Sequence, residues 1–179
     1  MNDGLIPNRY AKALFKVAVE KAEQDTLYAQ MKQLVASFDS TPALKAAVNN
    51  PFIAVDEKEK VLLTAAGAKK GSTLENFILL VIEKNRASFL RSMALAYLKL
   101  YREAFGIASV EIVTAIEMTD SEISGILDVV KRQLGDKKME KTVTVDSSLI
   151  GGFTVNVDGQ VLDASIKNEL KKLRLKLLS

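Results

Sequence analysis

The sequence contains no cysteine and no histidine in its 179 residues. Their absence excludes disulfides, thiol nucleophiles, histidine general bases and nearly all zinc sites. Long apolar runs are also lacking, because the longest, Phe77–Ile82, is far shorter than the roughly 20 residues that span a bilayer. The N-terminus has neither the apolar core of a signal peptide nor the Arg- and Ser-rich character of a transit peptide. We therefore expect a folded chain that is made and kept in the cytosol.

The composition is that of an ordinary globular protein, with 48% apolar and 26% charged residues. The length suffices for one large domain or two small ones. The net charge of +3 is modest, but positive charge gathers at the C-terminal end, where Glu169 is the one acidic residue after Asp163. The basic residues of this tail are Lys167, Lys171, Lys172, Arg174 and Lys176.

Apolar side chains recur at helical spacing throughout the first part of the chain, up to about residue 105. Thr41-Pro42 is typical of a helix start, Ser72–Glu75 forms a capping box, and Gly67 and Gly106 stand where helices end. The predicted helices cover about residues 7–22, 26–39, 42–50 and 56–66, a segment from residue 72, and 88–105. We expect residues 1–105 to fold as a six-helix bundle.

The periodicity changes after Gly106. Alternating apolar residues predict a strand over 110–117, a capping box at Thr119–Glu122 starts a helix that Gly135 closes, and 139–145 alternates again. The predicted fold class is therefore mainly α with a small α+β part: the bundle, then an α/β module over residues 106–179.

The segment 146–165 predicts a hairpin that leads into the last helix. Gly151-Gly152 opens one strand, and Asp158-Gly159 supplies the two left-handed positions of a tight turn. Ser165 then stands as the N-cap of a basic amphipathic helix. We expect one stripe of this helix to pack on the strands of its own module, leaving Leu175 and Leu178 for a partner. That stripe consists of Ile166, Leu170, Leu173 and Leu177.

No motif for catalysis or metal binding stands out. Residues 67–73 superficially resemble a phosphate loop, but a lysine precedes the second glycine and the flanks are helical, which favours an inter-helix turn. Asp146, Asp158 and Asp163 lack the spacing of a calcium loop, and turn or capping roles explain each. We expect neither a cofactor nor a metal.

Two helices carry more apolar surface than one buried stripe requires. The first has Tyr10, Ala13 and Val17 beside its core stripe, and the fifth is apolar on all sides over 77–82. Two interpretations remain open. The fifth helix could be the central helix of the bundle, or the first and fifth could border a groove for a foreign amphipathic helix.

Four blocks of sequence, in order, are similar to one known family. They are Arg9–Phe15, Asn50-Pro51 with Lys58, Asn76-Phe77 through Asn85-Arg86, and Asp146–Ser165. From about residue 7 to its end the chain resembles the delta subunit of F-type ATP synthase, the oligomycin-sensitivity-conferring protein of mitochondria. One departure is Ala164, where the family pattern has glycine.

The resemblance implies a non-catalytic stator subunit of a proton-transporting ATP synthase. Such a subunit is present in a single copy in a hetero-oligomer, peripheral to the cytoplasmic face of the bacterial inner membrane and not inserted into it. It ties the catalytic alpha/beta head to the peripheral stalk, so that rotation is coupled to ATP synthesis.

The resemblance also implies two partner sites. The bundle would hold the N-terminal helix of an alpha subunit at Tyr10, Ala13, Leu14, Val17, Phe77, Leu80 and Val81. The module would hold the C-terminus of the stalk b subunit at Leu170, Lys171, Leu173, Arg174, Leu175 and Leu178.

A nucleic-acid-binding adaptor that uses the basic C-terminal helix is the alternative. That helix lacks interleaved aromatic residues and carries a leucine stripe, which favours a protein partner and no nucleic acid.

Overall fold

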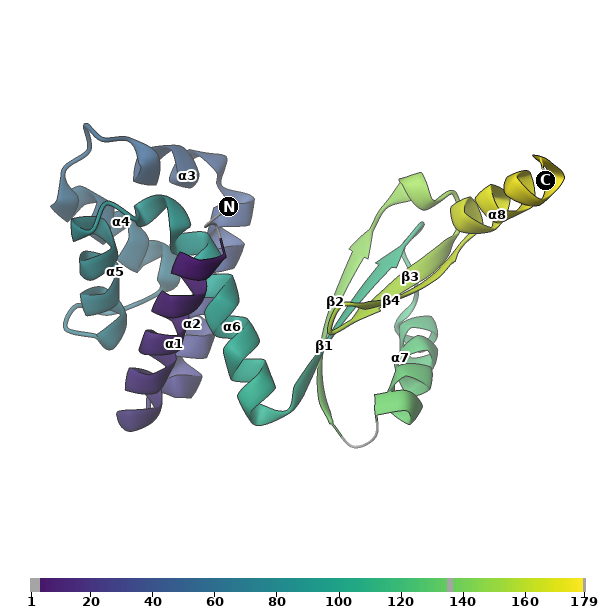
Figure 1. The fold of residues 1–179 in the computed structure, drawn as a ribbon, viewed down its shortest axis with the longest axis horizontal. Coiled ribbons are helices and arrows are strands. Elements are labelled where there is room, and N and C mark those ends of the chain that lie inside the picture. The colour runs from purple at the N-terminus through teal and green to yellow at the C-terminus, as the bar shows by residue number, and fades with distance from the viewer. Residues whose placement is uncertain (1–3, 135–136, 179) are drawn as a thin grey trace. The chain divides into compact units, whose positions relative to one another are not determined.

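The computed structural model describes residues 4–134 and 137–178, without the side chains of residues 133, 134 and 178. The predicted helix end at Gly135 lies outside these residues. The chain divides into two compact units, Met1–Tyr101 and Arg102–Ser179. The first is entirely helical and the second combines a four-stranded sheet with two helices, which confirms the predicted fold class (Figure 1).

The helices of the first unit follow the predicted order, with boundaries that differ by about two residues at most. They are α1 (Leu5–Glu20), α2 (Gln24–Ser40), α3 (Pro42–Asn49), α4 (Val55–Ala66), α5 (Thr73–Glu83), the short 3₁₀ helix η1 (Ala87–Phe89) and α6 (Leu90–Phe105). The helix α1 ends two residues early, because Ala22 adopts a left-handed φ of 55°.

The core of this unit closes around α5. Phe77, Ile78, Val81 and Ile82 are all buried there, while Leu80 keeps 44% of its surface exposed. The apolar character of α5 therefore serves mainly the core, as expected of a central helix, and one outward residue remains.

The turn between α4 and α5 confirms the interpretation of residues 67–73. Gly67 ends α4 at a left-handed φ of 61°, and the Ser72 hydroxyl accepts a hydrogen bond from the Glu75 N–H at 3.2 Å. The Glu75 carboxylate turns back to accept from the Gly71 N–H. Both helix ends are thus satisfied within the segment itself.

The second unit contains a sheet in the order β2-β1-β3-β4. Its elements are β1 (Ile107–Thr114), α7 (Asp120–Leu134), β2 (Lys138–Val145), the 3₁₀ helix η2 (Ser147–Leu149), β3 (Gly152–Val157), β4 (Gln160–Ser165) and α8 (Ile166–Leu178). β1 and β2 are parallel and joined through α7, whereas β3 is antiparallel to β1 and β4.

The predicted bounds of the first strand were wrong by three residues. β1 begins directly after Gly106, whose φ of 63° ends α6, and its pairing stops at Thr114, opposite Val145 and Phe153. Ile116, which continues the alternation in sequence, lies beyond the ladder and is exposed. Pairing partners, and not the alternation, set the end of the strand.

One face of the sheet packs on α7, where Val110, Ile112 and Val155 are buried with Ile123 and Val130. Cross-strand neighbours share a face, so Val143, Val145 and Leu162 lie on this same side. All three are nevertheless exposed. The helix α7 therefore covers only part of the apolar face.

The hairpin has the predicted turn, with positive φ at Asp158 (48°) and Gly159 (94°). Gly152 has a φ of 75° and lies so close to β4 that a Cβ atom there would come within 2.2 Å of the Ala164 carbonyl oxygen. Ala164 pairs with Phe153 inside the ladder. Its alanine therefore fits a strand position and needs no left-handed backbone.

The last helix begins without any loop after β4 (Figure 1). The Ser165 hydroxyl accepts from the Asn168 N–H at 3.2 Å, which confirms the predicted N-cap. Asp163 in turn accepts from the Ser165 N–H at 3.0 Å and its hydroxyl at 2.6 Å.

The expectation that α8 packs its stripe on its own strands was wrong. Ile166, Leu170, Leu173 and Leu177 keep between 45% and 86% of their surface exposed. A helix needs a connecting segment to fold back over a sheet, and none separates Ser165 from Ile166. In Figure 1, α8 continues away from the end of the sheet.

Replacing Gly152 by alanine should destabilise the second unit by about 1–3 kcal/mol, because the new Cβ would meet backbone in a left-handed conformation. Gly125→Ala is the matched control, since Gly125 lies within α7 with open space around it and should gain about 0.5–1 kcal/mol. Denaturant unfolding measures both, and equal effects would contradict this account of Gly152.

The cap of α8 should weaken in acid. Hydrogen bonds from the Ser165 hydroxyl and N–H, helped by Lys172 and Lys167, hold the pKa of Asp163 below its ordinary value. A lowered carboxyl pKa stabilises the fold at pH values above the unfolded pKa, about 4, and this stabilisation is lost as the pH falls through the folded pKa. The Asn168 amide resonance should therefore stay constant down to about pH 4 and move below it. In Asp163→Asn, whose amide oxygen still accepts, that movement should vanish; movement that persists would contradict this role of Asp163.

Candidate functional site

The aspartates considered for a metal site have structural roles. Asp146 accepts from the Ser148 N–H at 2.9 Å and its hydroxyl at 3.0 Å, and these bonds lower the pKa of Asp146. Asp158 accepts from the Ser109 N–H at 3.0 Å. Within the described ranges, no group of three or more carboxylates is arranged to hold a metal ion. The sites that the sequence predicted for partners are surfaces.

The first surface lies where α1 meets α5. The rings of Tyr10 and Phe77 meet edge to face, with centroids 6.3 Å apart and an interplanar angle of 67°. Nη1 of Arg86, just after α5, donates a hydrogen bond to the Tyr10 hydroxyl at 2.6 Å. Tyr10 is thus fixed from two sides by residues that follow it by more than sixty positions.

The residues predicted for this surface fall into two groups, one exposed to solvent and one buried in the core. Ala13, Val17 and Leu80 are exposed, with 37% of Val17 open to solvent, and Tyr10 is half-buried. Ala13 and Val17 follow Tyr10 by one and two helical turns and so share its face. We call Tyr10, Ala13, Val17 and Leu80 the α1–α5 surface.

The remaining predicted residues, Leu14, Phe77 and Val81, belong to the bundle core. They support the surface from beneath and expose almost nothing to a partner. Arg86 was not predicted, because nothing in the local sequence shows that it reaches Tyr10. The one available signal was its position in the Asn85-Arg86 block that carries the family resemblance.

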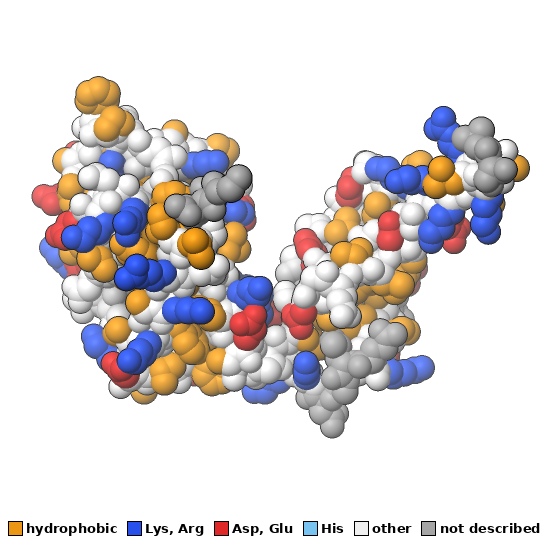
Figure 2. All heavy atoms as spheres, viewed as in Figure 1, with side chains coloured by type: hydrophobic (Ala, Val, Ile, Leu, Met, Phe, Trp, Pro, Cys, Tyr) orange, Lys and Arg blue, Asp and Glu red, His pale blue; other side chains and the backbone are white. Residues whose placement is uncertain are grey.

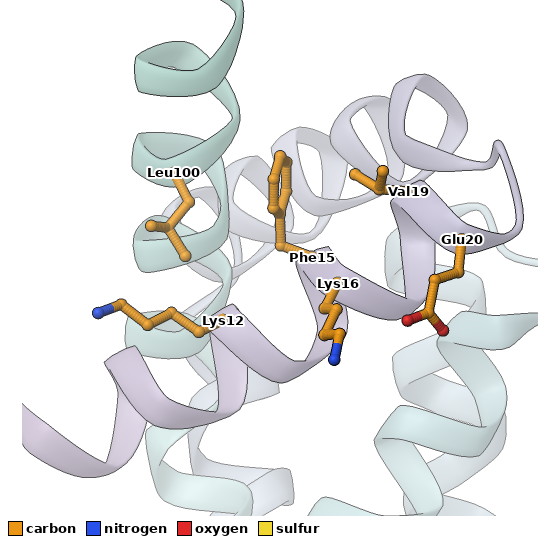
Figure 3. A pocket seen from close by; sticks show the side chains of 6 residues that line it. All are labelled: Lys12, Phe15, Lys16, Val19, Glu20 and Leu100. Atoms are coloured by element: carbon orange, nitrogen blue, oxygen red, sulfur yellow. The ribbon is translucent and has the colours of Figure 1, made fainter.

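A different hollow lies between α1 and α6 (Figure 3). Figure 3 shows Phe15 and Val19 of α1 and Leu100 of α6 around it, with the lysines of α1 at its margin. Its lining residues are Lys12, Phe15, Lys16, Val19, Glu20 and Leu100. None of them belongs to the α1–α5 surface.

The second predicted surface lies on α8. Leu170, Lys171, Leu173, Arg174 and Leu175 are all exposed, and the predicted Leu178 lies outside the described side chains. Figure 2 shows basic side chains gathered over this helix with apolar ones between them. The stripe expected to be internal is open as well, so α8 presents more apolar surface than predicted.

The open part of the sheet adjoins the start of α8. Val145 and Phe153 pair with Thr114 at the ladder end where Ala164 also lies, one residue before the Ser165 cap. The exposed Val145 thus sits at the end of the sheet from which α8 emerges. An apolar partner at this end would cover the sheet and the helix together.

None of the helices in the described part of the chain combines the length and apolar character required to cross a membrane.

Comparisons with known proteins agree with this architecture over almost the whole chain. The family model for the ATP synthase delta (OSCP) subunit matches residues 6–177. The "ATP synthase subunit delta" of Prochlorococcus marinus (strain MIT 9215) is 33% identical over 168 residues, which cover 94% of this chain and 93% of the relative. That of Parabacteroides distasonis is 35% identical over 178 residues, covering 99% and 98%.

The same fold occurs in a solved structure. A chain in the cryo-EM structure of the Toxoplasma gondii mitochondrial ATP synthase hexamer superposes with a TM-score of 0.77 at 22% identity, and 97% of each chain is covered. From the match of the family model and these relatives, the chain belongs to the ATP synthase delta (OSCP) subunit family.

Proposed function

We propose that this protein is the stator subunit that ties the catalytic head of a proton-transporting F-type ATP synthase to its peripheral stalk. As a subunit of the delta family it is non-catalytic. Its candidate sites are exposed surfaces suited to binding other proteins. The observation that carries the proposal is that each compact unit has exposed apolar surface of its own, at the α1–α5 surface in the first and on α8 in the second. A linker between two partners requires that arrangement.

The first unit, with its α1–α5 surface, would bind the N-terminal helix of an alpha subunit. Ala13 is small, so a helix backbone can approach α1 closely there, while the exposed Val17 and Leu80 offer apolar contacts. Tyr10 is held in place before binding, which lowers the entropy lost on association.

The second unit would bind the C-terminus of the stalk b subunit through α8. Exposed Leu170, Leu173 and Leu175 can supply most of the binding energy, and the basic residues between them favour an acidic partner and speed encounter. The nucleic-acid alternative has no support among the relatives, which are ATP synthase subunits. The protein would accordingly work at the cytoplasmic face of the bacterial membrane, as a peripheral single copy.

Ala13→Asp should weaken binding of an alpha N-terminal peptide by about 2–3 kcal/mol, because an unpaired carboxylate would be buried under the peptide. The fold should survive, since Ala13 is exposed in the isolated chain. Ala43→Asp, at an exposed position of α3, makes the same chemical change elsewhere and should leave the affinity unchanged. Calorimetric titration of both variants measures the difference, and an unaltered affinity in Ala13→Asp would place the peptide elsewhere.

A chain that ends at Asn168 should lose b binding and keep alpha-peptide binding. The described side chains of α8 after Asn168 are exposed, so their removal should leave the rest of the second unit folded. Binding to a soluble C-terminal fragment of b, with circular dichroism as the folding control, gives the measurement. Undiminished b binding would move the site to α7 or to the open sheet face at Val143, Val145 and Leu162.

A further inference from the structure

Arg86 lies beside the α1–α5 surface, and no carboxylate of the described part of the chain forms an ion pair with it. One of its several N–H groups donates to the Tyr10 hydroxyl, and its Cζ atom lies 5.3 Å from the centre of the Tyr10 ring. No carboxylate among the described residues lies within 4.0 Å of the guanidinium nitrogens. By contrast, Arg91 pairs with Asp39 at 2.7 Å.

Arg86 is only partly exposed to solvent, so water does not fully compensate for the missing carboxylate. Its side chain is half-buried, so the cation has lost part of its hydration. The bond to a neutral hydroxyl replaces only a fraction of that hydration and leaves the other donors of the planar guanidinium available. A carboxylate brought by a partner would accept charge-assisted hydrogen bonds from these remaining N–H donors.

We propose that Arg86 is the specificity-determining residue of the α1–α5 surface, and that it receives a carboxylate side chain of the docked helix. The inference rests on the proposed binding of an alpha-subunit helix and defines the chemistry of that helix. It must be amphipathic, with an acidic residue beside its apolar stripe.

The same geometry sets the spacing between the acidic and the apolar contact of a docked helix that runs along α1. Tyr10 and Arg86 mark one end of the surface, and Val17 lies about two helical turns further along α1. The acidic residue of the partner therefore lies about two turns from the apolar side chain that contacts Val17. For a partner of given sequence, the direction of binding is the one that brings its acidic residue to Arg86 and its apolar residue to Val17.

The test is a double-mutant cycle on the full-length chain. The probes are the N-terminal helix peptide of the alpha subunit from the same ATP synthase and a second version with its acidic residues replaced by amides. Arg86→Gln should bind the native peptide about tenfold more weakly, as expected for one charge-assisted hydrogen bond. The amide peptide should bind the unaltered chain with a similar loss, and combining both changes should cost no more than either alone.

Lys45→Gln is the matched control, because Lys45 is exposed on α3 and its replacement alters the net charge equally. Tyr10→Phe separates the two roles of the Arg86 side chain. It removes the hydroxyl that positions Arg86 and should weaken discrimination between the two peptides while keeping the apolar contact of the ring.

Additive losses in the cycle would overturn the inference and leave Arg86 as a support for Tyr10 alone, with the proposed function intact. The amide peptide on the unaltered chain gives an independent result even if Arg86→Gln fails to fold: an unchanged affinity would also overturn the inference. No binding of the native peptide to the unaltered chain would overturn the proposed function itself and this inference with it.

Discussion

Burial of α5 is the constraint on which the first unit depends. Phe77, Ile78, Val81 and Ile82 are enclosed by the surrounding helices, and this enclosure fixes α1 and the end of α5 side by side through Tyr10. With Phe77 and Arg86 both held against Tyr10, the rotation of α5 about its axis is fixed. Leu80 then points outward. The α1–α5 surface is therefore a consequence of how the core closes. It is rigid for the same reason, since the residues beneath it are packed. Tyr10, its aromatic residue, is held by both the Phe77 ring and the Arg86 guanidinium.

In the second unit, the constraint is that one helix has to cover a whole sheet face. Its sheet has one apolar face and a single helix, α7, to cover it, so Val143, Val145 and Leu162 remain open. The last helix cannot help, because it continues directly from β4 and has no loop with which to return. A helix of this length gains little stability from its own hydrogen bonds, so α8 depends on its Asp163–Ser165 cap, and a partner that covered its leucines would stabilise it further. Partner binding and order in α8 should accordingly be linked.

The two units thus suit two kinds of attachment. The first offers a preformed surface with the Arg86 cation held at its edge, which favours a partner helix that carries an acidic residue at that edge. The second offers an extended, basic and apolar helix whose contacts are gained together with its own stability. A subunit that holds the catalytic head of an ATP synthase against torque needs strong binding at both attachment surfaces, and neither surface has to catalyse a reaction. The absence of cysteine and histidine costs such a protein nothing.

The sequence by itself determined what depends on near neighbours along the chain. The Ser72 and Ser165 caps, the Asp158-Gly159 turn and the change of periodicity at Gly106 were all predictable, because each signal lies within a few residues of its effect. The exposure of Ala13, Val17 and Leu80 followed from the same periodicity, combined with the family resemblance. Only the tertiary structure decided the rest. The end of β1 at Thr114 was set by its partner strands, and Arg86 reaches Tyr10 across a separation of 76 residues. The stripe of α8 has the pattern of a buried face yet stays exposed, because periodicity shows which side chains share a face, and only the path of the chain determines what covers it.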